Sequence, residues 1–174
     1  MLKQWRGERK LAAQAAVQYA AVSHVAREPR LYAEFGVSDT VDGRLEMLVL
    51  HLVLAMDRVR QIEPDGEATA RALGEAFVTH MDDTMRAIGV GDLSVPRKVK
   101  KAAAALYDAH LEYGPALTAT GDSLAAWRHA LQLRLVGRAA APAADIEALA
   151  AYAMAWQLRL RLQPDAHVIA GQLD

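Results

Sequence analysis

Six histidines are the side chains of this chain best suited to ligate a metal or to carry a proton: His24, His51, His80, His110, His129 and His167. Zincin proteases need a second histidine four residues after the first, and helical di-iron proteins need a glutamate three residues before a histidine. Neither spacing occurs in the sequence. His51 lies in the most apolar segment and could ligate haem or a metal. We expect instead a hydrogen-bonded core histidine, because no partner ligand accompanies it. The sequence therefore predicts no metal site and no cofactor.

Nucleophiles and paired carboxylates are also lacking. The chain has no cysteine and no Gly-x-Ser-x-Gly motif, so thiol chemistry and this serine hydrolase motif are excluded. Asp82 and Asp83 are adjacent on an expected helix, so their side chains diverge by about 100° and cannot share a proton. We expect one of them to pair with Arg86, three or four residues later. Gly89-Val90-Gly91 follows a helix and lacks the third glycine of a dinucleotide loop. The sequence predicts no enzyme.

One dense basic cluster is present: Arg97, Lys98, Lys100 and Lys101, directly after Pro96. Pro96 suits the first turn of a helix, where its missing N–H is not needed. Cations at a helix N-terminus oppose the helix dipole, so this position favours a surface that meets an anionic partner such as RNA phosphate, lipid headgroups or an acidic protein. No aromatic residues interleave, and base stacking is not supported. A solvated helix face is the alternative.

The elements that must position these residues are helices. Ala, Leu, Arg, Glu and Gln dominate, and no segment alternates with a period of two. We predict an all-α, single-domain bundle of about six helices around a central apolar helix over residues 39–61. The six predicted helices span residues 3–27, 39–61, 65–88, 94–113, 122–137 and 142–162. Residues 31–37 are expected to form a short turn or helix, and residues 165–174 a loose tail.

Composition supports one folded domain. The chain has 174 residues, of which 53% are hydrophobic, and 20 basic side chains oppose 21 acidic ones. It is too apolar to be disordered, and it lacks the basic excess of a general nucleic-acid binder, so we expect no DNA partner. The longest uncharged apolar stretch, Met47 to Met56, is too short to cross a membrane. The charged start predicts no signal peptide.

Two segments together resemble a known family. The first reads Phe35-Gly36-Val37-Ser38-Asp39-Thr40-Val41-Asp42-Gly43-Arg44. The second reads Gly89-Val90-Gly91-Asp92-Leu93-Ser94-Val95-Pro96-Arg97-Lys98-Val99-Lys100-Lys101, and it follows Asp82-Asp83 and Arg86. This combination resembles the ubiquinol–cytochrome c chaperone family, in its short bacterial form. We assign residues 31–136 to the family-like domain, residues 1–30 to a basic N-terminal helix, and residues 137–174 to a C-terminal helix and tail in the same globular unit.

The resemblance implies a non-catalytic chaperone for assembly of the cytochrome bc1 complex, which binds newly made cytochrome b. It implies a cytoplasmic protein that is peripheral at the inner membrane. Through the basic cluster it could meet the ribosome or an anionic membrane surface, and a second assembly factor could join it. Methionines suit an adaptable client surface, and Met47, Met56, Met81 and Met85 lie on the second and third predicted helices. For any one of them, ordinary packing in the core is the favoured alternative.

The other motif residues are interpreted as structural. Asp39, Asp42 and Gly43 open the central helix, where the acids act as caps and dipole partners. Arg44 is expected to pair with Asp82 or Asp83 and so to clasp the second and third predicted helices together. A different class of function remains open, since an apolar central helix with His51 would also suit a helical carrier of lipid, quinone or haem.

Overall fold

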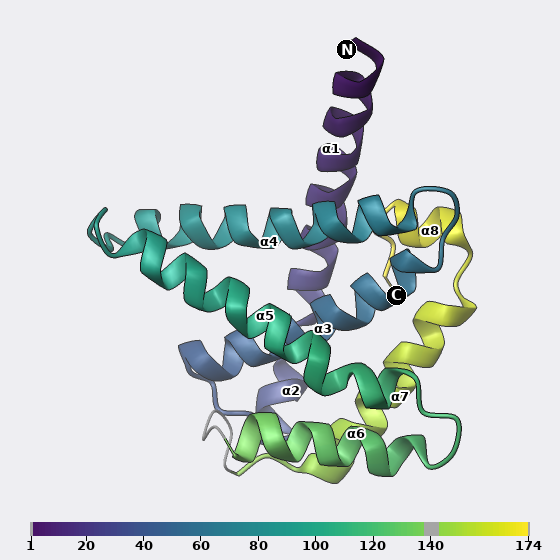
Figure 1. Ribbon diagram of the computed structural model, residues 1–174. Coiled ribbons are helices and arrows are strands. Elements are labelled where there is room, and N and C mark those ends of the chain that lie inside the picture. The colour runs from purple at the N-terminus through teal and green to yellow at the C-terminus, as the bar shows by residue number, and fades with distance from the viewer. Residues whose placement is uncertain (1, 138–142, 174) are drawn as a thin grey trace.

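The computed structural model describes residues 2–137 and 143–173, and in this part of the chain every regular element is helical (Figure 1). The elements are α1 Leu2–Val25, α2 Pro29–Ala33, α3 Val41–Arg60, α4 Gly66–Ala87, α5 Val95–Leu117, α6 Ser123–Leu131, the π-helical turn η1 Gln132–Val136, α7 Ile146–Leu162 and α8 Asp165–Ile169. The predicted all-α class is confirmed. The six predicted helices correspond to α1 and α3–α7.

Helix α3 lies at the centre of the bundle. Every residue from 49 to 55 is buried, and α3 contacts α1, α4, α5, α7 and η1. A helix that is apolar on all sides must be covered on all sides, which explains this position. Its first turn is closed by Thr40, whose Oγ1 accepts a hydrogen bond from the Gly43 N–H at 3.1 Å. Asp42 lies in that first turn, where its negative charge interacts favourably with the helix dipole.

Two helix boundaries differ from the sequence prediction. α5 does not stop at Gly114 but runs through Pro115 to Leu117. The last turn persists because Leu117 is buried and its carbonyl accepts hydrogen bonds from Gln157 and Arg161. α7 begins at Ile146, where the Asp145 carboxylate caps the Ala148 N–H at 3.0 Å. The expected start at Pro142 lies outside the described residues.

The prediction of a loose tail is wrong. Residues 165–169 form α8, and Val168 and Leu173 are buried. The Gln18 side-chain amide of α1 donates to the Val168 carbonyl at 3.1 Å. Arg58 of α3 donates to the Leu160 carbonyl at 2.8 Å and forms an ion pair with Asp165. Contacts with distant segments therefore hold residues 165–173 in place, and no local sequence pattern predicts these contacts.

A buried cation joins three elements. The Arg134 side chain in η1 is 0% exposed, and its Nε donates to the Glu46 carboxylate of α3 at 2.9 Å. Its Nη1 donates to the Glu112 carboxylate of α5 at 2.8 Å. The guanidinium also lies 5.5 Å from the centre of the Tyr113 ring. Two carboxylates and an aromatic ring compensate for the loss of hydration that burying a guanidinium entails.

His51 is a core residue, as expected. It is fully buried, its Nδ1 lies 2.7 Å from the Met47 carbonyl, and its Nε2 lies 2.7 Å from the Tyr152 hydroxyl. A carbonyl can only accept, so Nδ1 carries the proton and Nε2 accepts from Tyr152. Burial lowers the pKa of His51 to about 4. Both ring nitrogens are thus occupied by the protein itself, and neither is free to ligate a metal.

The buried ion pair leads to a stability prediction. Glu46→Ala should lower the free energy of unfolding by about 3 kcal/mol, because it leaves the buried Arg134 guanidinium with one carboxylate instead of two. Denaturant unfolding followed by circular dichroism measures this change. Asp39→Ala is the control, since it breaks the exposed Asp39–Arg44 pair and should change stability little. Equal effects of the two substitutions would contradict the structural role of Glu46.

His51 leads to a pH prediction. Its pKa in the folded protein, about 4, lies below the ordinary value of 6.5, so the unfolded chain binds the proton first as pH falls. Stability from the neutral ring is therefore fully present above pH 6.5 and is lost down to about pH 4, by about 3 kcal/mol in all. His51→Gln should flatten the unfolding free energy across this window. His167→Gln, at an exposed position, should keep the wild-type slope.

Candidate binding groove and basic patch

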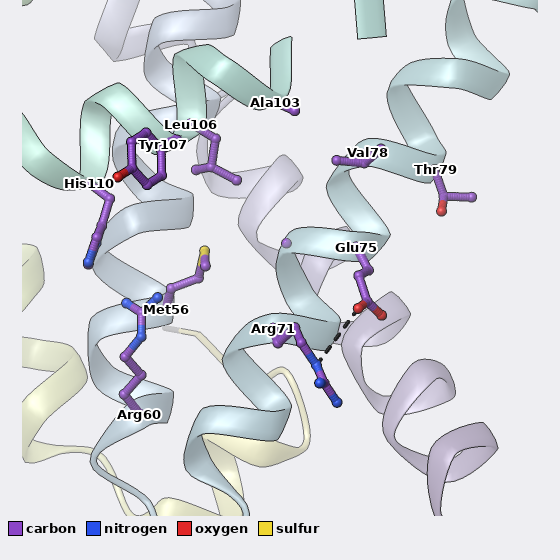
Figure 2. A pocket seen from close by; sticks show the side chains of 11 residues that line it. Met56, Arg60, Arg71, Glu75, Val78, Thr79, Ala103, Leu106, Tyr107 and His110 are labelled. Carbon is purple, nitrogen blue, oxygen red and sulfur yellow. Dashed lines mark ion pairs between the residues drawn. The ribbon is translucent and has the colours of Figure 1, made fainter. Parts of the chain in front are cut away.

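A groove with a cavity volume of about 480 Å³ opens between α3, α4 and α5. Its apolar lining comes from all three helices (Figure 2): Met56 from α3, Gly74 and Val78 from α4, and Ala103 and Leu106 from α5. A Cβ added to Gly74 would lie 3.7 Å from the Met56 methyl group, so the glycine leaves the space beside Met56 open. Tyr107 stands at the rim and is 65% exposed. The groove can accept an apolar side chain or segment.

One end of this groove is polar. Figure 2 shows His110 and Arg60 beside each other there, away from Val78 and Thr79. The Arg60 Nη1 and the His110 Nδ1 are buried, and neither finds a hydrogen-bond partner in the described part of the chain. Burial and the nearby Arg60 cation lower the pKa of His110, which favours its neutral form. Unmatched buried polar atoms are costly, and an acceptor on a bound molecule would satisfy the Arg60 donor.

Charged side chains line the groove on the α4 side. Arg71 and Glu75 face each other one turn apart at 3.8 Å, as the dashed line in Figure 2 shows. Both are exposed, so this pair contributes little to stability. Arg60 also approaches Glu67, at 3.7 Å through its Nε. The groove therefore combines an apolar floor with exposed charges at its edge.

A second groove, of about 600 Å³, lies between α1 and α4 on the other side of α4. Small side chains form much of it: Ala12, Ala16 and Ala20 from α1, and Ala72 and Ala76 from α4. Polar and charged groups are interspersed among them, namely Tyr19, Ser23, Arg27, Glu75, Thr79, His80 and Asp83. This groove is therefore more polar in its lining than the one between α3, α4 and α5.

The basic cluster lies where the sequence predicts, in the first two turns of α5. Arg97, Lys98, Lys100 and Lys101 are all exposed, and none of them pairs with a carboxylate within residues 2–137 and 143–173. Pro96 occupies the first turn. The Ser94 side chain forms no capping hydrogen bond, so the α5 N-terminus carries cations without a compensating cap. We call these four residues the basic patch.

Arg86 organises the loop that leads to this patch. Its Nε donates to Asp82 at 2.6 Å and its Nη1 to Asp92 at 2.9 Å. The expected pairing of Arg86 with one of the two adjacent aspartates is confirmed for Asp82. Asp83 is exposed and lines the α1–α4 groove instead. Gly89, with φ +78°, ends α4 in the left-handed conformation that glycine favours, and the neighbouring Gly91 faces open space.

The predicted clasp between α3 and α4 is wrong. Arg44 pairs with Asp39 at 2.5 Å and lies over the Tyr32 ring at 5.3 Å, so its partners precede α3 and do not come from α4. The Arg44 hydrogen bond lowers the pKa of Asp39. Figure 1 shows the reason, because α3 and α4 diverge from the turn that joins them and the start of α3 is far from the end of α4.

Phe35 and Gly36 hold the segment before α3 against the start of α7. The Phe35 carbonyl accepts a hydrogen bond from the Asp145 N–H at 2.8 Å, and its ring lies 5.6 Å from the Tyr152 ring. Gly36 has φ +68°, and a Cβ there would lie 2.8 Å from the Ala143 carbonyl oxygen. Glycine is thus required at this close approach. These motif residues have a structural role.

Arg60 and His110 are groove residues that the sequence analysis does not single out. They lie 50 positions apart, and only the packing of α3 against α5 brings them together. Of the four methionines considered for a client surface or for the core, Met47 is buried in the core, Met56 lines the groove, and Met81 and Met85 are half-buried on α4. The methionine pattern is therefore a partial signal for the groove.

Two classes of feature are missing from residues 2–137 and 143–173. No three His, Asp or Glu side chains converge in a way that would hold a metal ion. No helix there combines the length and the apolar character needed to cross a bilayer.

Comparison with known proteins identifies the family. The model of the ubiquinol-cytochrome C chaperone family matches residues 33–174. The chain is also similar to a solved structure, the crystal structure of the Cbp3 homolog from Brucella abortus. The two share 32% sequence identity with a TM-score of 0.76, over 98% of this chain and 94% of that one. No curated protein matches the chain. The match reaches past residue 136 to the C-terminus, and we conclude that the chain belongs to the ubiquinol-cytochrome C chaperone family.

Proposed function

We propose that this member of the family is a non-catalytic chaperone that binds newly made cytochrome b and that the α3–α4–α5 groove is its client site. Family membership supports a role in assembly of the cytochrome bc1 complex. The observation that carries the finer proposal is the open apolar floor formed by Met56, Val78 and Leu106. Open apolar surface of this kind marks a binding site on a soluble domain.

The chemistry of the groove suits a membrane-protein client. An apolar segment of cytochrome b, before it enters the bilayer, needs cover for its side chains and partners for any exposed backbone carbonyl. Met56 can adapt its shape to different side chains. The Arg60 Nη1, which has no partner in the described structure, can donate to a carbonyl or carboxylate at the groove end. No step of bond making or breaking enters this role.

We assign the client to this groove and not to the α1–α4 groove because of the linings. The aliphatic side chains of the α1–α4 groove are all alanines, and they are interspersed with charged residues. The α3–α4–α5 groove instead offers the larger apolar side chains of Met56, Val78 and Leu106, which can cover more of an apolar segment. In the α3–α4–α5 groove, the charges of Arg71 and Glu75 lie at the edge and remain exposed. A second assembly factor, if one joins, would then have the α1–α4 groove to occupy.

The proposal also includes a location. A protein that receives cytochrome b acts on the cytoplasmic side of the inner membrane, and we place this one there as a peripheral protein. The exposed basic patch supports an anionic partner, and both a ribosome and an anionic bilayer present phosphate groups to such cations.

Blocking the groove tests the client site. Ala103→Trp fills the space next to Leu106 with a large rigid side chain, so we expect cytochrome b to fall toward the level of a deletion strain. Ala104→Trp is the matched control, because Ala104 is exposed on the same helix and does not line the groove. Complementation of the deletion strain, with haem b read from reduced-minus-oxidised spectra, measures the effect. Equal cytochrome b levels in the two strains would contradict the assignment of the groove.

The broader role has its own test. Deleting the gene should lower both bc1 activity and cytochrome b, because the client then lacks its chaperone. A photoreactive residue in place of Tyr107, at the groove rim, should crosslink to cytochrome b in cells. Unchanged bc1 activity and cytochrome b in the deletion strain would reject the chaperone proposal.

A small-molecule carrier is the second candidate, and one observation favours it. The groove joins an apolar floor to the unpaired Arg60 and His110 nitrogens, and a quinone carbonyl or lipid headgroup could use the same donors. His51 gives this candidate no support, since both its nitrogens are hydrogen-bonded in the core. Pigment or lipid that copurifies with the protein and is released in stoichiometric amount would establish the carrier role. Its absence from purified protein would favour the polypeptide client.

A further inference from the structure

The loop between α4 and α5 exposes large apolar side chains where the chain could have placed polar ones. Leu93 is 99% exposed and Ile88 is 73% exposed. Figure 1 shows this loop at the far left, beyond the ends of the other helices. The free energy falls when a partner removes exposed apolar surface from water, so such surface favours binding.

The loop is held in this shape by its own hydrogen bonds. The Val90 N–H donates to the Met85 carbonyl at 3.0 Å, and the Ser94 N–H donates to the Gly91 carbonyl at 2.7 Å. Arg86 ties Asp92 back to α4. These interactions define the conformation of the loop, so the exposed position of Leu93 is a property of the folded protein.

Positively charged residues follow these two apolar residues closely in the sequence. The basic patch begins four residues after Leu93, and its cations are exposed and without carboxylate partners in the described structure. At about 100° per residue, Arg97, Lys100 and Lys101 share one side of α5, opposite to the buried Ala102 and Leu106. Asp82 and Asp92 share one cation, Arg86, so together with the four cations of the patch these residues keep a net charge of about +3.

We infer that Ile88, Leu93 and the basic patch form a docking tip for an anionic lipid bilayer. The two apolar side chains enter the boundary between headgroups and acyl chains, and the four cations bind headgroup phosphates. A ribosomal RNA surface would use the cations but would leave Leu93 and Ile88 in water, which is why the bilayer is favoured. The inference rests on the proposed peripheral location at the membrane. It names the residues that would contact the bilayer.

Tryptophan fluorescence tests insertion. In a Trp5→Phe background, Leu93→Trp should shift its emission to the blue and be quenched by brominated acyl chains when vesicles of phosphatidylglycerol and phosphatidylcholine are added. Vesicles of phosphatidylcholine alone should give no shift. The control is Leu162→Trp, since Leu162 is 76% exposed at the end of α7 and should not respond. An unchanged Leu93→Trp emission on anionic vesicles would overturn the inference.

Flotation with the same vesicles tests the two parts of the tip separately. Leu93→Ser should weaken binding about tenfold by removing one buried apolar side chain. Replacing Arg97, Lys98, Lys100 and Lys101 with Gln should abolish the salt sensitivity of binding and leave thermal stability unchanged or slightly higher, since the cations oppose the helix dipole. Wild-type protein that binds ribosomes or an acidic protein but not vesicles would overturn the inference.

The outcomes separate this inference from the proposed function. The vesicle experiments contain no cytochrome b, and the deletion strain requires no knowledge of the tip. Normal vesicle binding with unchanged cytochrome b in the deletion strain would reject the chaperone role alone. Loss of cytochrome b in the deletion strain, together with no vesicle binding, would reject the docking tip alone.

Discussion

The fold depends on covering α3, a helix that is apolar on every side. Helices α1, α4, α5 and α7 and the turn η1 all pack against it, and residues 49–55 are buried. Helices pack against one another at an angle set by their side-chain ridges, so α4 and α5 cannot follow α3 along its whole length. Where they diverge from it, a groove opens beside Met56 and Leu106. Where they extend beyond it, they form the exposed tip at Leu93. Both candidate sites thus follow from one packing constraint.

Polar groups in this protein divide into two kinds. Two fully buried basic side chains of the core are paired: Arg134 lies between two carboxylates, and His51 lies between a carbonyl and a hydroxyl. In the groove and at the tip other polar groups are not paired, as the Arg60 Nη1 and the basic patch illustrate. A buried pair mainly specifies and holds the fold. An unpaired donor or cation at a concave or projecting surface is available to a partner.

The sequence predicts those features that depend on local patterns. The apolar run from Met47 to Met56 indicates the central helix, and the spacing of Asp82 and Arg86 indicates their pairing. Features that depend on crossing angles are not predictable in this way. The predicted pairing of Arg44 with Asp82 or Asp83 fails because α3 and α4 diverge from the turn that joins them. The burial of Arg134 depends on Glu46, which lies 88 residues earlier, and no spacing rule covers such a distance.

The tip and the groove share α5, and this fixes how far apart they act. From Arg97 to Leu106 the helix rises about 14 Å, at about 1.5 Å per residue. With the tip seated among the headgroups, the groove therefore lies within about half a bilayer thickness of the membrane surface. An apolar segment of the proposed client, held in the groove, would therefore stay close to the bilayer. Docking also restricts the orientation of α5, so the polar end of the groove at His110 points away from the tip and toward the body of the protein.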